Sequence, residues 1–200
     1  QISQNETDAA LEDLQAATDL LSGEPEKAWE ERLQLRRLRA HILNKQERYP
    51  LAISELLVAL DDLRSRKAES ALRLELLLEL MSSQAHLQQW QDFTILYAEF
   101  LKTREEAPHV PISEAVEGLF AQIESERNPR SDESTRLARA DVLVALARLY
   151  GQLQPEASGS VQARALFQRG SERLACQRTT EALEDLSESI AQLRSLDSEP

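Results

Sequence analysis

The chain has 200 residues and a formal net charge of −12, from 35 acidic and 23 basic residues. Nucleic-acid affinity depends on basic contacts to phosphates, so this acidity argues against DNA or RNA as the partner. Apolar residues make up 42% of the chain, glycine occurs five times and proline seven times, which favours helix nearly everywhere. Valine and isoleucine are too sparse, and period-two alternation too rare, for a sheet. The predicted class is all-α.

Nine helices are predicted in chain order. The first covers 8–21, after a frayed stretch at 1–7, and the last is followed by an acidic tail at 198–200. Ser113 is the expected N-cap of the sixth helix, and 154–160 is expected to be the most flexible linker. The leucine-rich fourth helix should be the most buried, because it is apolar on more than one face. The helices after the first are expected over 26–46, 50–64, 68–87, 90–103, 113–126, 132–153, 161–176 and 180–196.

A short pattern recurs on alternate helices. Ala182-Leu183-Glu184-Asp185-Leu186 has the same five letters as Ala10-Leu11-Glu12-Asp13-Leu14, and Ala52-Ile53-Ser54-Glu55-Leu56 is a third copy. The apolar letters are expected to pack in the core and the Glu-Asp pair to face solvent. The anchor residues of the five alternate helices, spaced by 42, 41, 45 and 44, are Ala10, Ala52, Phe93, Ala138 and Ala182.

This near-constant period predicts a solenoid of antiparallel helical hairpins, in which stacking on neighbouring hairpins supplies the core. The alternative is an irregular helical bundle, since every amphipathic helix repeats its apolar residues at i, i+4 and i+7. The small residue that recurs at the anchor, together with the even period, favours the solenoid.

The hairpins resemble tetratricopeptide repeats (TPRs). The period exceeds the roughly 34 residues usual for that family, so the resemblance is to a degenerate, long-helix variant. One domain over 1–200 is predicted, and its strongest units are 26–64, 68–103 and 161–196. The residues that match the family's packing positions are Ala40, Tyr49, Ala52, Leu56 and Ala59; Leu77, Trp90, Tyr97 and Phe100; and Leu166, Gly170, Leu174, Ala182, Leu186 and Ser189.

The resemblance implies that the first helix of each hairpin lines a concave groove that binds a partner. The family's carboxylate clamp uses Lys and Asn there, whereas Arg37 and His41 stand at those places and acids follow in the next repeat. This departure argues against the clamp, and the mixed charge favours a partner segment carrying both signs. The residues assigned to the groove are Arg37, His41, Asn44, Lys45, Glu75, Glu79, Ser82, His86, Phe167 and Ser171.

The charged residues of the groove helices allow two readings. Glu75 and Glu79 stand one turn apart and could bind a basic peptide, but we favour exposure to solvent or pairing with arginines. The second helix is unusually basic, and its arginines either bind acidic groups or form a solvated face whose stems cover the leucines. These basic residues are Arg32, Arg36, Arg37, Arg39, Lys45 and Arg48.

No known catalytic pattern is present. The sequence has no P-loop, dinucleotide fingerprint, HExxH or nucleophile elbow. Its histidines, His41, His86 and His109, are far apart and form no helical metal pair. Cys176 is the only cysteine, which excludes an intrachain disulfide, and a buried, small apolar role is expected for it. We therefore expect no enzyme activity, no cofactor and no metal.

The expected function is that of a scaffold or adaptor that holds a peptide or helical segment of another protein. Arg37 and Lys45 would orient an acidic residue of that partner. The alternative is a regulatory or sensor domain of a larger multidomain protein. No membrane span is expected, and a homo-oligomer stays open. The single cysteine suits a reducing, cytoplasmic compartment, and a start at Gln1 suggests a trimmed or processed N-terminus.

Overall fold

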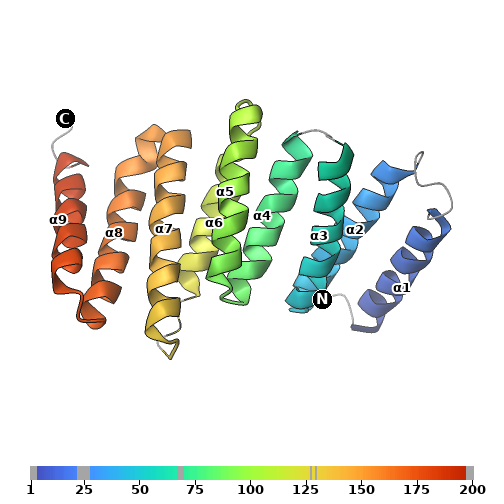
Figure 1. The fold of residues 1–200 in the computed structure, drawn as a ribbon, viewed down its shortest axis with the longest axis horizontal. Helices are drawn as coiled ribbons and strands as arrows, with labels where there is room; N and C mark the ends of the chain where they lie inside the picture. Colours follow the sequence, from blue (N-terminus) through green and yellow to red (C-terminus); the bar gives the residue numbers. More distant parts are fainter. Residues whose placement is uncertain (1–3, 22–27, 67–69, 127, 129, 197–200) are drawn as a thin grey trace. The chain divides into compact units, whose positions relative to one another are not determined.

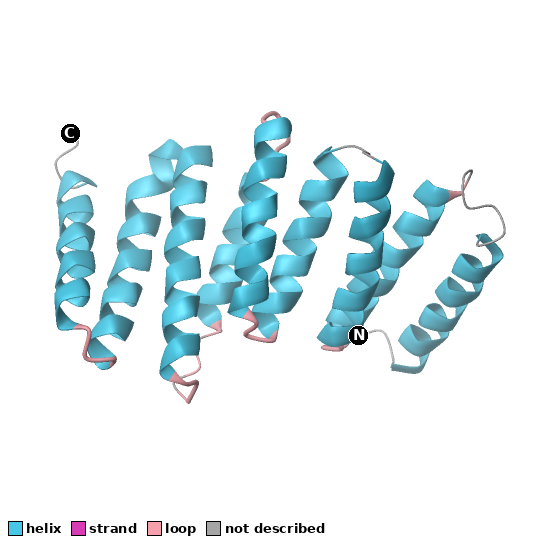
Figure 2. Cartoon of the chain, in the orientation of Figure 1, coloured by secondary structure: helices cyan, strands magenta, loops and turns pink. Residues whose placement is uncertain are grey.

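All regular structure in the described part of the chain is helical (Figures 1 and 2). The computed structural model describes residues 4–21, 28–66, 70–126, 128 and 130–196. The all-α prediction is confirmed. The helices are α1 (Gln4–Leu21), α2 (Trp29–Lys45), α3 (Tyr49–Arg66), α4 (Ser70–His86), α5 (Trp90–Glu106), α6 (Ser113–Ser125), α7 (Glu133–Leu153), the 3-10 helix η1 (Pro155–Ala157), α8 (Ser158–Ala175) and α9 (Thr179–Leu196).

The helices belong to two compact units, each described by itself. The first unit comprises Gln1–Leu87 and Ile95–Pro108, and the second comprises Gln88–Thr94 and His109–Pro200. In the first, α2 packs against α1 and α3, and α3 packs against α4. In the second, α7 packs against α6 and α8, and α8 against α9 (Figure 1). The most closely packed helices are thus neighbours in sequence, as hairpin repeats require. The single domain over 1–200 stays a prediction.

The core of each unit centres on one long apolar helix. α4 buries nine of its 17 residues, so the deep burial expected for the leucine-rich helix is found. α7 shares this property, with eleven of 21 residues buried. An amphipathic helix buries a single stripe, whereas α4 and α7 are apolar on more than one side and pack on more than one side.

Several helices are followed by a residue whose backbone adopts the left-handed conformation, with a positive φ. Glu47, after α2, has φ 59°, and the N–H of Arg48 donates to the carbonyl oxygen of Leu43 at 2.9 Å. This is the Schellman ending of a helix, for which glycine is the usual residue. Gln177 after α8 and Gln88 after α4 have φ 60° and 57°. The recurrence of this conformation at equivalent turns supports the hairpin repeat.

Replacing Glu47 with glycine is expected to stabilise the chain. An L-residue with positive φ is strained, and glycine removes that strain, so we expect a gain of about 0.5–1 kcal/mol over Glu47→Gln. The glutamine variant separates the effect of backbone conformation from that of charge. Urea denaturation followed by circular dichroism measures both. Equal stability of the two variants would contradict the strain argument.

Three predictions about element ends were wrong. Ser113 is the first residue of α6 rather than its N-cap; Ile112 takes the cap position, and its side chain is buried rather than hydrogen-bonded. Residues 4–7, expected to be frayed, belong to α1. The stretch 154–160 is not a loose linker but contains η1 and the first turn of α8. The predicted stop of the first helix at 22–23 and the predicted start of the second at 26 lie outside the described residues.

The stretch 154–160 is structured because it packs closely on α7. Both η1 and α8 contact α7. A Cβ atom at Gly151 of α7 would collide with the side chains of Ser158 and Gln162. Glycine therefore allows this close approach, and the turn-forming composition of the stretch did not reveal it.

Candidate functional site

In α9 the last acid of the repeated pattern is buried, and the prediction that the Glu-Asp pair faces solvent was wrong for this residue. Glu184 is exposed, but Asp185 on α9 is only 3% exposed. The Asp185 carboxylate accepts hydrogen bonds from Arg169 at 2.6 Å and from Arg173 at 2.9 Å, both on α8. A buried carboxylate needs such partners because desolvation penalises an isolated charge. Asp185 thus joins the two helices of the last hairpin.

The hairpin of α2 and α3 contains the same arrangement. Glu55 of α3 follows its anchor Ala52 by three residues, as Asp185 follows its own anchor alanine. The Glu55 carboxylate pairs with Arg36 at 2.9 Å and with Arg39 at 3.1 Å, both on α2. Two arginines of the basic second helix therefore pair with an acid of their own hairpin.

The residues assigned to the groove in the first unit come from α2 and α4, and we call them the α2–α4 face: Arg37, His41, Asn44, Lys45, Glu75, Glu79, Ser82 and His86. Arg37 pairs with Glu75 at 2.9 Å and with Glu79 at 2.6 Å. Asn44 accepts a hydrogen bond from the hydroxyl of Ser83 at 3.0 Å. These contacts join two helices that are not consecutive in sequence, and in them Glu75 and Glu79 pair with an arginine, which is one of the two arrangements that we favoured from the sequence.

The charges of the α2–α4 face remain partly open to solvent. The side chain of Arg37 is 23% exposed, that of Glu75 52% and that of Glu79 33%. Burial acts to lower the pKa of Arg37, but the hydrogen bond and charge of Glu79 outweigh it, so the pKa lies above its ordinary value. The guanidinium is therefore a permanent charge held between two carboxylates.

The other residues of the α2–α4 face are mostly exposed. His41 and Lys45 are exposed on α2, and Ser82 is half-buried on α4. His86 is exposed and stacks on Tyr49, with ring centroids 4.4 Å apart. The face therefore carries a stacked aromatic pair beside mixed charge.

The two remaining predicted residues lie in the second unit. Phe167 of α8 is 58% exposed, which is unusual for a large aromatic side chain. Ser171 is half-buried, and its hydroxyl donates to the carbonyl oxygen of Phe167 at 2.8 Å within the same helix. Phe167 is thus exposed on α8 and available for contact, whereas the Ser171 hydroxyl is hydrogen-bonded within its own helix.

A buried ionic cluster in the second unit was missed by sequence reasoning. Glu172 of α8 is 3% exposed and lies 3.4 Å from Arg136 and 3.9 Å from Arg139 of α7. Arg139 is also buried and donates to the carbonyl oxygen of Ile123 of α6 at 3.0 Å. The signal was Arg136 and Arg139 at i, i+3, in a helix that buries eleven of its 21 residues.

Cys176 lies beside this cluster and is half-buried rather than buried as predicted. A guanidinium nitrogen of Arg136 is 3.6 Å from its sulfur. Desolvation, followed by the charge of Glu133, raises the pKa of the thiol. A thiol with a raised pKa is less readily ionised to the reactive thiolate.

The described residues hold no group of three or more His, Cys, Asp or Glu side chains placed to bind a metal ion. Within the same residues, no helix combines the length and the apolar character that crossing a membrane requires. The candidate site therefore consists of ion pairs and hydrogen bonds between helices, with exposed side chains beside them.

The comparison with known proteins finds a similar fold. No family model matches the sequence, and no curated protein matches it. Among solved structures, TPR-like repeats assigned to a kinesin light chain of Podospora anserina are similar, with a TM-score of 0.53 and 14% identity over 98% of this chain and 90% of that chain. The chain therefore has the fold of a degenerate array of TPR-like helical hairpins.

Proposed function

We propose that the chain is a non-enzymatic scaffold or adaptor whose α2–α4 face binds a peptide or helical segment of another protein. TPR-like folds commonly mediate protein–protein interaction and are typically non-catalytic, which supports the proposal in general terms. The observation that carries it is the Arg37 guanidinium between Glu75 and Glu79, with all three side chains partly exposed. Specific recognition uses such fixed charges.

The charge arrangement suggests what the partner segment carries. Arg37 is already paired, so the strongest free cation of the α2–α4 face is Lys45, which is exposed. Glu75, on α4, is half-exposed and presents a negative charge on the same face. A segment with an acidic residue near Lys45 and a basic residue near Glu75 would complement both. Packing against the stacked Tyr49 and His86 would supply apolar contact.

The test is charge reversal of Lys45 together with Arg37. A partner recovered by affinity capture is mapped to its binding segment, and a peptide of that sequence is titrated by calorimetry. Lys45→Glu alone should weaken binding about tenfold at low salt, because an attractive charge becomes repulsive. Arg37→Glu with Lys45→Glu should weaken it further, because the ion pairs that hold Glu75 and Glu79 in place are also lost. The measurement is repeated at high salt, where screening should reduce the difference.

The matched control is Lys102→Glu, which reverses an exposed lysine of α5 that lies outside the α2–α4 face. Circular dichroism checks that each variant keeps its helicity, because Arg37 also links α2 to α4. Unchanged affinity in Lys45→Glu, or equal losses in Lys45→Glu and Lys102→Glu, would remove the α2–α4 face as the binding site.

The cytoplasmic location expected from the single cysteine stays a prediction.

A further inference from the structure

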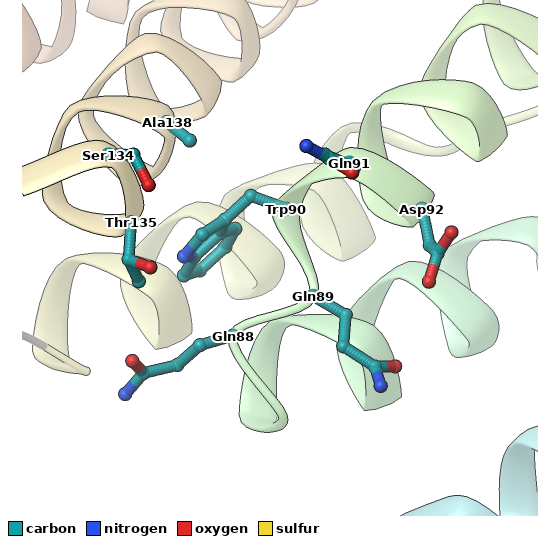
Figure 3. A pocket seen from close by; sticks show the side chains of 8 residues that line it. All are labelled: Gln88, Gln89, Trp90, Gln91, Asp92, Ser134, Thr135 and Ala138. Atoms are coloured by element: carbon teal, nitrogen blue, oxygen red, sulfur yellow. The ribbon is translucent and has the colours of Figure 1, made fainter. Parts of the chain in front are cut away.

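The starts of α5 and α7 lie beside one pocket of the second unit. Its volume is about 310 Å³. The pocket is bounded by the residues before and at the start of α5 and by the first turns of α7 (Figure 3). At the start of α7 the carboxylate of Asp132 already accepts from the backbone N–H of Thr135 at 2.9 Å, so the free polar groups of the pocket are those of side chains. The lining residues are Gln88, Gln89, Trp90, Gln91, Asp92, Ser134, Thr135 and Ala138.

The indole of Trp90 points into this region with an unused donor. Trp90 is 3% exposed, and its Nε1 atom is buried and has no hydrogen-bond partner. In Figure 3 the nitrogen lies on the edge of the ring that faces Thr135. A buried indole N–H normally finds an acceptor, because leaving it unpaired costs the desolvation of the group. The unpaired donor therefore indicates an acceptor that the described residues do not supply.

The neighbouring polar groups have defined hydrogen-bonding roles. The hydroxyls of Ser134 and Thr135 donate to the carboxylate of Asp132 at 2.6 and 2.7 Å, which leaves their oxygens as acceptors. Gln88 accepts from the hydroxyl of Ser131 at 2.9 Å through its Oε1, which leaves its amide NH₂ as a donor. The pocket thus presents donors at Trp90 and Gln88 next to acceptors at Thr135 and Ser134.

Adjacent donors and acceptors of this kind match an amide. A carbonyl oxygen would accept from the Trp90 indole, and the amide N–H would donate to the Thr135 hydroxyl oxygen. The lining contains no lysine or arginine, and Asp92 brings a carboxylate, so an anionic ligand is disfavoured. A neutral carboxamide satisfies the donors and acceptors without bringing a charge.

We propose that this pocket binds the carboxamide side chain of a glutamine or asparagine in a peptide, with the carbonyl on Trp90 Nε1 and the amide N–H on Thr135. The pocket lies wholly in the second unit and shares no residue with the α2–α4 face. It therefore does not rest on the function proposed for that face, and either proposal can fail alone.

The test observes the indole N–H signals by proton–nitrogen NMR of the full chain. The chain has two tryptophans, Trp29 and Trp90, so the signal of Trp29 in the first unit is an internal control. N-acetyl-glutamine methylamide is titrated into the protein, with N-acetyl-glutamate methylamide as the anionic isostere and free L-glutamine as the alternative source of the carboxamide. We expect a saturable shift of the Trp90 signal alone, strongest with the capped glutamine.

The matched variants are Thr135→Val, which removes the hydroxyl acceptor, and Thr135→Ser, which keeps it. Loss of one hydrogen bond should weaken probe binding about tenfold in the valine variant and little in the serine variant. If Thr135→Val is unfolded, Ser134→Ala provides the second acceptor test. A stronger response to free L-glutamine would assign the pocket to the amino acid instead of a peptide. No saturable shift, or equal shifts with the glutamate probe, would overturn the proposal.

Discussion

Asp185→Ala is expected to lower the free energy of unfolding by about 3 kcal/mol. Removing one partner of a buried ion pair typically costs 3–5 kcal/mol, because the remaining charges stay desolvated without compensation. Here the variant leaves the guanidinium groups of Arg169 and Arg173 without their buried acceptor. Asp141 lies 3.4 Å from Arg169, so part of the electrostatic compensation remains, and we expect the lower end of that range.

The neighbouring acid provides the control for Asp185. Glu184 has the same charge, is next in sequence and is exposed on α9. Glu184→Ala should change the free energy of unfolding by less than about 0.5 kcal/mol, as expected of exposed surface positions. Urea denaturation of the full chain, monitored by circular dichroism, compares the two variants. A difference below about 1 kcal/mol between them would show that the buried carboxylate does not hold α9 against α8.

Leu56→Ala is expected to destabilise the first unit by about 2–5 kcal/mol. Leu56 of α3 is completely buried, and its truncation removes apolar contacts and leaves a cavity that neighbours fill only in part. Leu57 is the next residue of the same helix and is 40% exposed, so Leu57→Ala deletes the same atoms where water already reaches them. The second variant should cost less than about 1 kcal/mol.

Measurement of these leucine variants should use amide hydrogen exchange as well as urea denaturation. Exchange reports local opening, so it separates the α2–α4 helices of the first unit from the helices of the second. We expect Leu56→Ala to speed exchange mainly in α2, α3 and α4, since α3 packs on both of its neighbours. Comparable losses for Leu56→Ala and Leu57→Ala would mean that α3 presents a different face to the core.

The helices of the described regions were predictable from sequence because apolar periodicity and turn residues act locally. The start at Trp90 and the end at Leu196 were correct, and most other ends differ by one to three residues. The wrong predictions arose where packing decides. Ile112 starts α6 through burial of its side chain, and Gly151 brings η1 against α7 through a close approach. Neither effect has a sequence signature within its own segment.

Identical letters also reached different environments. Asp13 in α1 is exposed, whereas Asp185 in α9 is buried, although both occupy the fourth place of Ala-Leu-Glu-Asp-Leu. The difference comes from the preceding helix: α8 supplies Arg169 and Arg173 to Asp185. Burial of a charge therefore depends on residues 12 and 16 positions away, which a short motif does not contain.

The repeat period made it possible to predict which residues of the candidate site lie close together. Arg37 and Glu79 are 42 residues apart, close to the spacing of the anchors, so equivalent places on α2 and α4 meet. The pocket beside Trp90 joins segments at a similar separation, since Ser131 and Gln88 are 43 residues apart. The free donors and acceptors of this pocket were not predictable, because they depend on which hydroxyl groups already donate hydrogen bonds to Asp132.

The packing of each helix on its neighbours in sequence has a consequence for how the chain folds. Within each unit, the most closely packed helix pairs are separated by short connections, so little loop entropy is lost when they meet. Chains with such local contacts fold in microseconds to milliseconds, far faster than β-rich domains of comparable stability. A hairpin such as α2 with α3 can form soon after its residues leave the ribosome, before α7, α8 and α9 have been synthesised.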